Sequence, residues 1–165
     1  MMMKPSRNRD VFQAAFLLAQ VGGHAASRFA NRLAELELGP PHAGILRMLG
    51  STPAMTQQAL AGALRILPSR LVALLDELEG RALIARRENP DDRRSYALHI
   101  TEKGRSTLET IGRISREHQK SLLAALSVEE QGQLADLLQR IADEQGLTRG
   151  VHPGYSRMGR SSDVD

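Results

Sequence analysis

The sequence predicts a mostly α-helical fold that carries one small β-hairpin. Apolar residues recur at spacings of three and four over most of the chain, and one stretch near residue 95 alternates with a period of two. Aromatic residues make up only 3% of a chain that is 41% hydrophobic. A core built mainly from Leu, Ile, Val, Ala and Met favours helices over a β-sandwich. The 165 residues have the length of one domain of ordinary size.

The composition limits the classes of function. The chain has no cysteine, which removes disulfides, thiolate metal sites and cysteine redox switches. We find no apolar run of membrane-spanning length and no signal-peptide pattern, so we expect a soluble cytoplasmic protein. The net charge is only +3, but basic residues gather between Arg86 and Arg105. This cluster indicates either a polyanion partner or a solvated basic surface.

The first half of the chain predicts two helices behind a flexible leader at residues 1–9. Asp10 can cap a helix that continues to about Leu36, because Phe12, Ala15, Phe16 and Ala19 recur at helical spacing. The Gly39-Pro40-Pro41 stretch ends that helix and begins a second one, whose apolar side includes Ile45, Met48 and Leu49.

The next stretch predicts a helix-turn-helix. Thr56 can cap a short helix through Leu64, residues 65–67 form a tight connection, and Pro68 suits the first position of a longer helix. That helix has a core stripe of leucines at positions 71, 74, 75 and 78. Ser69 and Arg70 lie off this stripe near the helix start, where they can meet a ligand.

A hairpin and two further helices follow. Leu83–Glu88 and Ser95–Thr101 read as paired strands joined by residues 89–94, and a hairpin in this position forms a wing. Thr101 can cap a helix to about Ala125, which has an apolar seam for another helix. Ser127 and Glu130 form a capping box that opens the last helix. From residue 147 to 165 we expect a flexible tail.

The wing segment "NPDDRRSYALHITEKG" resembles that of the MarR family of bacterial winged helix-turn-helix regulators. "MTQQALAGAL" and "PSRLVALLDELEGRALIARR" are similar to the two helix-turn-helix segments of that family, and "ELGPPHAGILRML" is similar to its lead-in helix. The resemblance implies a DNA-binding lobe at residues 39–101 and a helical dimerisation region at 10–38 and 102–146. It also implies a homodimer on a pseudo-palindromic operator in double-stranded DNA, and in many relatives a small, often aromatic, effector releases the DNA.

Four positions depart from the family pattern. Arg65 and Ala82 stand where relatives often carry a Gly at a helix end, Leu67 replaces a polar N-cap, and Ala73 replaces a polar or basic residue. These changes motivate an alternative function: a helical dimer that binds a small molecule or protein and has lost specific DNA recognition.

We expect the DNA contacts to come from two places. Ser69 and Arg70 enter the major groove with the helix N-terminus, whose partial charge is positive. Arg94 enters the minor groove, and Asp92 holds its guanidinium extended. Arg93 serves the turn or nearby phosphates. Arg86 and Arg87 are flanking phosphate contacts.

Enzyme, metal and cofactor functions find no support in the sequence. The five histidines are scattered with no pair at i and i+4, and no Gly-rich phosphate loop or GxSxG motif is present. We therefore predict a sequence-specific DNA-binding transcriptional regulator, a repressor released by a small-molecule effector, with no catalytic residues, metal or cofactor.

Overall fold

A computed structural model describes residues 13–156 of the chain. The expected leader at residues 1–9 and the cap at Asp10 lie outside this range. The described elements are α1 (Gln13–Ala34), α2 (Pro40–Ser51), β1 (Met55–Thr56), α3 (Gln57–Leu64), α4 (Pro68–Gly80), β2 (Ile84–Asn89), β3 (Asp92–Ile100), α5 (Glu102–Leu122), α6 (Val128–Glu144) and the 3₁₀ turn η1 (Pro153–Tyr155).

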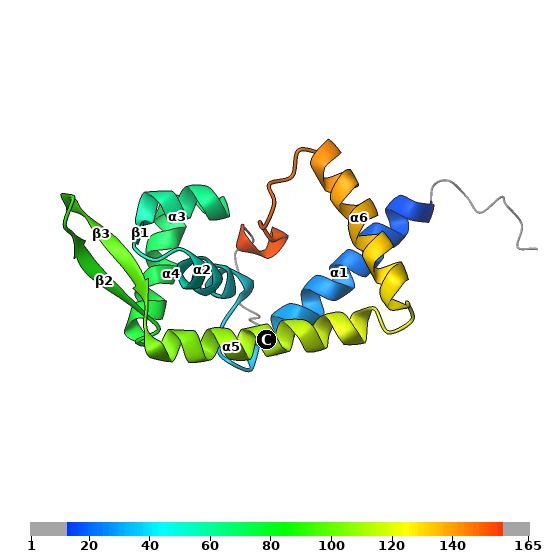
Figure 1. Cartoon of the computed structure of the whole chain (residues 1–165), viewed down its shortest axis with the longest axis horizontal. Coiled ribbons are helices and arrows are strands. Elements are labelled where there is room, and N and C mark those ends of the chain that lie inside the picture. Colours follow the sequence, from blue (N-terminus) through cyan, green and yellow to red (C-terminus); the bar gives the residue numbers. More distant parts are fainter. Residues whose placement is uncertain (1–12, 157–165) are drawn as a thin grey trace, which may run out of the picture.

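The elements separate into a lobe and a base (Figure 1). Helices α2, α3 and α4 and the sheet form the lobe at one end, and the β2–β3 hairpin projects from it. Helix α5 runs from the sheet to the other end of the molecule, where α1 and α6 lie. We name α1, α5 and α6 the base. The predicted mostly helical fold with a hairpin wing is therefore confirmed. The sheet also contains β1, a two-residue strand that the sequence did not predict and that pairs antiparallel with β3, giving the order β1-β3-β2.

The buried core lies in the lobe. All four leucines of the predicted α4 stripe are buried, and they pack with apolar side chains of α2 and α3. From outside the lobe, α1 contributes Leu33 and α5 contributes Ile111 to this cluster. Helix α6 contains no buried residue, and α1 contains only Leu33. The buried core of the described residues thus lies in the lobe, and α1 and α6 contribute only Leu33 to it.

The helix caps predicted at Thr56, Thr101 and Ser127 are present. The hydroxyl of Thr56 accepts a hydrogen bond from the backbone N–H of Ala59 (3.1 Å), and Ser127 and Glu130 form the reciprocal capping box. Pro68 begins α4 as predicted. These local signals locate helix starts correctly because each one satisfies backbone N–H groups that the helix itself leaves unpaired.

Two departures from the family pattern retain the backbone that glycine usually provides. Arg65 ends α3 in the left-handed region (φ 55°), and Ala82 follows α4 in the same region (φ 58°). The left-handed conformation costs an L-residue with a side chain about 1–2 kcal/mol. Leu67 stands at the N-cap of α4 with no side-chain cap, as expected. The turn geometry therefore survives, at a local cost in stability.

A crowded junction joins the end of α4, the exit of the wing and the start of α5. Thr101 caps α5 by accepting from the N–H of Gly104 (3.0 Å), and its hydroxyl donates to the carbonyl of Ala82 (2.6 Å). A Cβ at position 104 would collide with the carbonyl oxygen of Leu83. Thr-x-x-Gly thus lets the helix start approach another backbone closely.

The segment after α6 corrects one expectation. Residues 147–165 were expected to form a flexible tail, but the stretch from Val151 to Tyr155 packs against the lobe. Tyr155 is only 4% exposed and belongs to the core cluster. The reason is tertiary: the segment returns to α2, whose Gly44 leaves room for the tyrosine ring. Residues 157–165 lie outside the described range.

By length and composition, none of the described helices could cross a membrane alone. The consecutive pair α3 and α4, bent by 111°, passes that test only when the two are taken together. Both helices belong to the lobe, and each turns a leucine-rich side into its core.

Gly104→Ala should destabilise the protein by about 2 kcal/mol, because the added methyl group forces the α5 start away from Leu83. The measurement is the free energy of unfolding in urea. Gly62→Ala, in the exposed middle of α3 with open space around its Cβ, is the control and should be neutral or stabilising. Equal stability of both variants would contradict the proposed close approach.

Arg65→Gly should raise the free energy of unfolding by about 1 kcal/mol, since glycine occupies the left-handed region without strain. Ala73→Gly, in the interior of α4, should lower it by about 1 kcal/mol and serves as the matched control. A loss of stability in Arg65→Gly would show that the side chain contributes more than its backbone strain costs.

Candidate DNA-binding face and neighbouring cavity

The start of α4 presents backbone and side-chain donors to solvent. Ser69 is exposed and Arg70 is half-buried, so the predicted contact residues lie where expected on the helix. Because Leu67 provides no side-chain cap, the first backbone N–H groups of α4 are not capped by that residue. A helix N-terminus of this kind suits a phosphate group.

The tip of the wing is shorter than predicted. Residues 89–94 were expected to connect the strands, but β2 extends to Asn89 and β3 begins at Asp92, so only Pro90 and Asp91 form the turn. Arg93 and Arg94 are exposed and lie within β3. The turn is short for a local reason: the Asn89 side chain accepts from the N–H of Asp91 (3.1 Å) and closes a tight turn.

Asp92 acts on Arg94 differently from what was expected. Its carboxylate accepts a hydrogen bond from the backbone N–H of Arg94 (3.0 Å), and the ion pairs found in residues 13–156 do not include these two side chains. The short Asp side chain readily accepts from the backbone N–H two residues later, as in an Asx-turn. Asp92 therefore fixes the backbone path at Arg94 and does not hold the guanidinium itself.

Arg86 is also used differently. It was expected to be a flanking phosphate contact, but its guanidinium pairs with Asp76 (2.8 Å) and Glu79 (3.0 Å) of α4. Its side chain is 24% exposed. Arg86 therefore ties the wing to α4, whereas Arg87 is exposed. Sequence reasoning missed this role because the acidic partners lie one element earlier in the chain.

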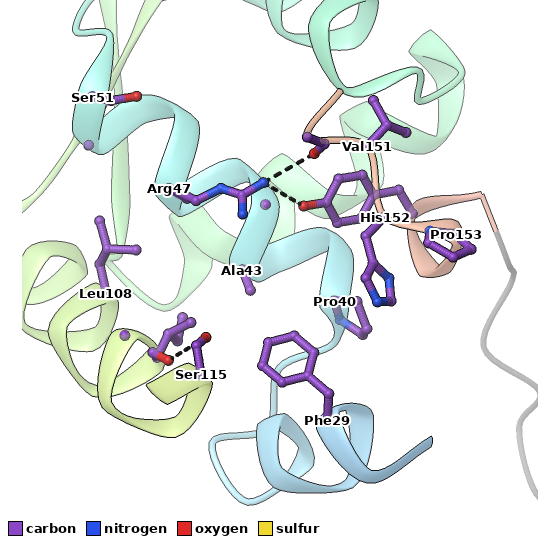
Figure 2. Close-up of a pocket in the computed structure, with 16 residues that line it drawn as sticks. Phe29, Pro40, Ala43, Arg47, Ser51, Leu108, Ser115, Val151, His152 and Pro153 are labelled. Carbon is purple, nitrogen blue, oxygen red and sulfur yellow. Dashed lines mark hydrogen bonds between the residues drawn. The ribbon is translucent and has the colours of Figure 1, made fainter. Parts of the chain in front are cut away.

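A cavity of about 790 Å³ separates the lobe from the base. Figure 2 shows α2 with Arg47 on one side, Phe29 of α1 and Leu108 and Ser115 of α5 on another, and the returning C-terminal segment with His152 on the third. A second cavity of about 500 Å³ lies next to it between α1, α5 and α6, and it also borders Phe29 and His152. The sequence indicated none of these lining residues as a site.

Two signals in the sequence could have found the cavity wall. Only five residues of the chain are Phe or Tyr, and one of them, Tyr155, lies in a segment that otherwise reads as a tail. Gly44 lies inside a helix, where glycine costs about 1 kcal/mol relative to Ala unless something approaches closely. An aromatic residue in a tail and a glycine in a helix together indicate a contact.

Burial and neighbouring positive charges favour the neutral form of the two histidines that line the cavities. Burial, and then the positive charge of Arg47, lower the pKa of His152; burial, Arg28 and Arg32 lower the pKa of His118. His118 stacks near Phe29 with ring centroids 5.6 Å apart, as a packing residue would. Across residues 13–156, no three His, Asp or Glu side chains gather closely enough to hold a metal ion.

Known proteins resemble this chain over most of its length. The sequence model of the MarR family matches residues 38–96. A putative transcriptional regulatory protein for the hcr operon of Thauera aromatica is 34% identical over 125 residues, which cover 75% of each chain.

Two solved structures add to this likeness. The transcriptional repressor CouR, bound to a 23-mer DNA duplex, is 31% identical and matches 86% of this chain and 99% of its own, with a TM-score of 0.69. A probable transcriptional regulator from Pseudomonas aeruginosa is 31% identical and matches 78% and 96%, with a TM-score of 0.67. All three relatives are regulators by their descriptions, and none is described as an enzyme.

Substitutions in the wing should show whether Asp92 acts through its hydrogen bond to the backbone of Arg94 or through its negative charge. Arg94→Ala should weaken DNA binding and reduce the slope of log K against log salt by about one ion pair. Asp92→Asn should bind DNA at least as tightly as the wild type, because the amide oxygen still accepts from the Arg94 N–H, whereas Asp92→Ala should bind less tightly. The measurement is fluorescence anisotropy at several salt concentrations.

Arg113→Ala, in the exposed middle of α5, is the charge-matched control and should leave the salt slope unchanged. If Asp92→Asn lost as much affinity as Asp92→Ala, the carboxylate charge would matter rather than its backbone hydrogen bond.

Proposed function

The chain belongs to the MarR family of transcriptional regulators, and from this we propose that it is a homodimeric repressor that binds a pseudo-palindromic operator and releases it when a small aromatic effector binds. One observation carries the DNA-binding part of the proposal. An exposed helix start and a wing with Arg93 and Arg94 belong to one lobe, in which the Arg86 ion pairs join the wing to α4.

The geometry supports a division of labour on the DNA. Helix α4 fits the major groove, where Ser69 and Arg70 read bases or grip phosphates. The wing reaches the adjoining minor groove, where Arg94 inserts, with Arg93 and Arg87 near the phosphate backbone. A regulator of this kind acts in the bacterial cytoplasm, where its operator is found.

The base supports a homodimer. Large apolar side chains of α1 and α6 are exposed in the single chain, including Phe16 at 66%, Leu17 at 49%, Leu137 at 53% and Ile141 at 46%. Exposed apolar side chains on two adjacent helices are typical of an interface. A two-fold axis through this base presents two lobes to half-sites about 10 bp apart.

The cavity supports control by a small molecule. It lies between α2 of the lobe and α1 and α5 of the base, so an occupant changes how these two parts sit against each other. A ligand that favours a lobe spacing unsuited to DNA lowers DNA affinity, typically by about 5- to 150-fold. The effector therefore acts at a distance from the DNA contacts.

The alternative of lost DNA recognition rests on Arg65, Leu67, Ala73 and Ala82. Arg65 and Ala82 retain the left-handed backbone expected of a glycine, so the shape of the lobe is kept. This favours the repressor. The alternative predicts weak DNA binding that is independent of sequence.

Titration of the full chain with the duplex upstream of its own gene should show tight, salt-sensitive binding that excess nonspecific DNA does not abolish. Footprinting should protect two half-sites about one helical turn apart. Members of a panel of aromatic acids and phenols should reduce the affinity. Weak binding that is independent of sequence would favour the alternative function, and tight binding that no panel member changes would contradict control by an aromatic effector.

A further inference from the structure

The C-terminal segment after α6 makes a specific path back to the lobe. Gly146 (φ 68°) and Gly150 (φ 76°) turn the chain in the left-handed region, and Arg149 pairs with Asp143 at the end of α6 (2.8 Å). Figure 1 shows the segment crossing from α6 toward α2. We name residues 147–156 the strap.

The strap is seated by Tyr155 on helix α2. A Cβ at Gly44 would lie 2.6 Å from the Tyr155 ring, so the ring rests directly on the helix backbone. At Gly154, a Cβ would lie 3.1 Å from the Pro40 side chain, which is a second close approach. Tyr155 is 4% exposed. Two glycines and one buried aromatic ring therefore define the docking position.

The docked strap holds Arg47. One guanidinium nitrogen of Arg47, Nη2, donates both to the carbonyl of Gly150 (3.1 Å) and to the hydroxyl of Tyr155 (3.1 Å), as Figure 2 shows. A guanidinium has five N–H groups on three nitrogens. Within residues 13–156, both hydrogen bonds of Arg47 use Nη2, so the donors on Nε and Nη1 of this exposed side chain are available to a further acceptor.

The cavity wall is mostly apolar and carries several rings, and Ser51 and Ser115 add hydroxyl groups to it. Arg47 is the only Arg, Lys, Asp or Glu among the described residues that line it. Burial, and then the positive charge of Arg47, lower the pKa of His152, which favours its neutral form. Its ring lies 6.2 Å from that of Phe29 and 5.8 Å from that of Tyr155, measured between centroids. A flat apolar body with one negative group matches these walls.

We propose that the strap is part of the ligand site: Tyr155 is a positioning residue that, with the Gly150 carbonyl, holds Arg47 so that the cavity selects an aromatic ligand carrying one anionic group. This rests on the proposed function in that it takes the cavity to be the effector site. Anion recognition by a guanidinium depends on its orientation, and a free arginine loses rotamer entropy when it binds. The strap removes part of that cost before the ligand arrives.

The test compares 2-naphthoate with its neutral counterpart 2-naphthamide, using calorimetry on the full chain without DNA. Wild type should bind the carboxylate about tenfold or more tightly than the amide, as a charge-assisted hydrogen bond allows. Tyr155→Phe should reduce this ratio several-fold and leave the affinity for the amide unchanged. A purely structural role of the hydroxyl would weaken both probes together. Arg47→Gln should abolish the preference.

A second variant tests docking of the strap as a whole. Gly44→Ala should displace Tyr155 and reduce the ratio in the same way, whereas Gly62→Ala, with open space around its Cβ, should keep it. Tyr96→Phe leaves Tyr155 as the only tyrosine, because the chain has two tyrosines and no tryptophan. In that background, acrylamide should quench tyrosine fluorescence weakly, and more strongly after Gly44→Ala.

The outcomes are distinct from those of the proposed function. If wild type shows no preference for the carboxylate, or if Tyr155→Phe and Gly44→Ala keep the wild-type preference, the inference is overturned. If the preference depends on the strap but 2-naphthoate does not change DNA affinity, the strap stands and its use for DNA release by this ligand class fails.

Discussion

The close contact between the start of α5 and the end of α4 is the constraint on which the rest of the structure depends. Thr101 and Gly104 bring the first turn of α5 against the backbone of Ala82 and Leu83. Helix α4 and the wing both end at this point, and the long helix α5 begins there. A shift at this point would move the wing, α4 and the base relative to one another.

The ion pairs of Arg86 add a second tie at the other side of the wing. Its two carboxylate partners lie on α4, so these ion pairs join the strand that carries Arg87 to the helix that carries Ser69. Partly shielded pairs of this kind set geometry more than they add stability. Asp92 has the same character at the tip, since it directs the backbone of Arg94 without neutralising the side chain.

The base differs from the lobe because, within residues 13–156, α6 has no buried residue and α1 has only Leu33. Apolar side chains on α1 and α6 are left exposed, while the cavity and the strap lie between base and lobe. Helix α2 connects this boundary to the lobe, because it lines the cavity and also packs into the lobe core. The strap extends this link, because a segment that leaves the base at α6 makes its buried contact on the lobe at Gly44.

The helices, their caps and the existence of the wing follow from the sequence alone, because each depends on residues that are close together in the chain. Thr56, Thr101 and Ser127 cap helices with neighbours three residues away, and the α4 leucine stripe follows from helical period alone. The tertiary structure decided what depends on residues distant in the chain: the pairing of Arg86 with α4, the strand β1, the docking of Tyr155 on Gly44, and the cavity. The spacing of residues along the chain encodes contacts within one helical turn. Contacts across the fold depend on where separate elements meet, and the spacing of residues does not specify this.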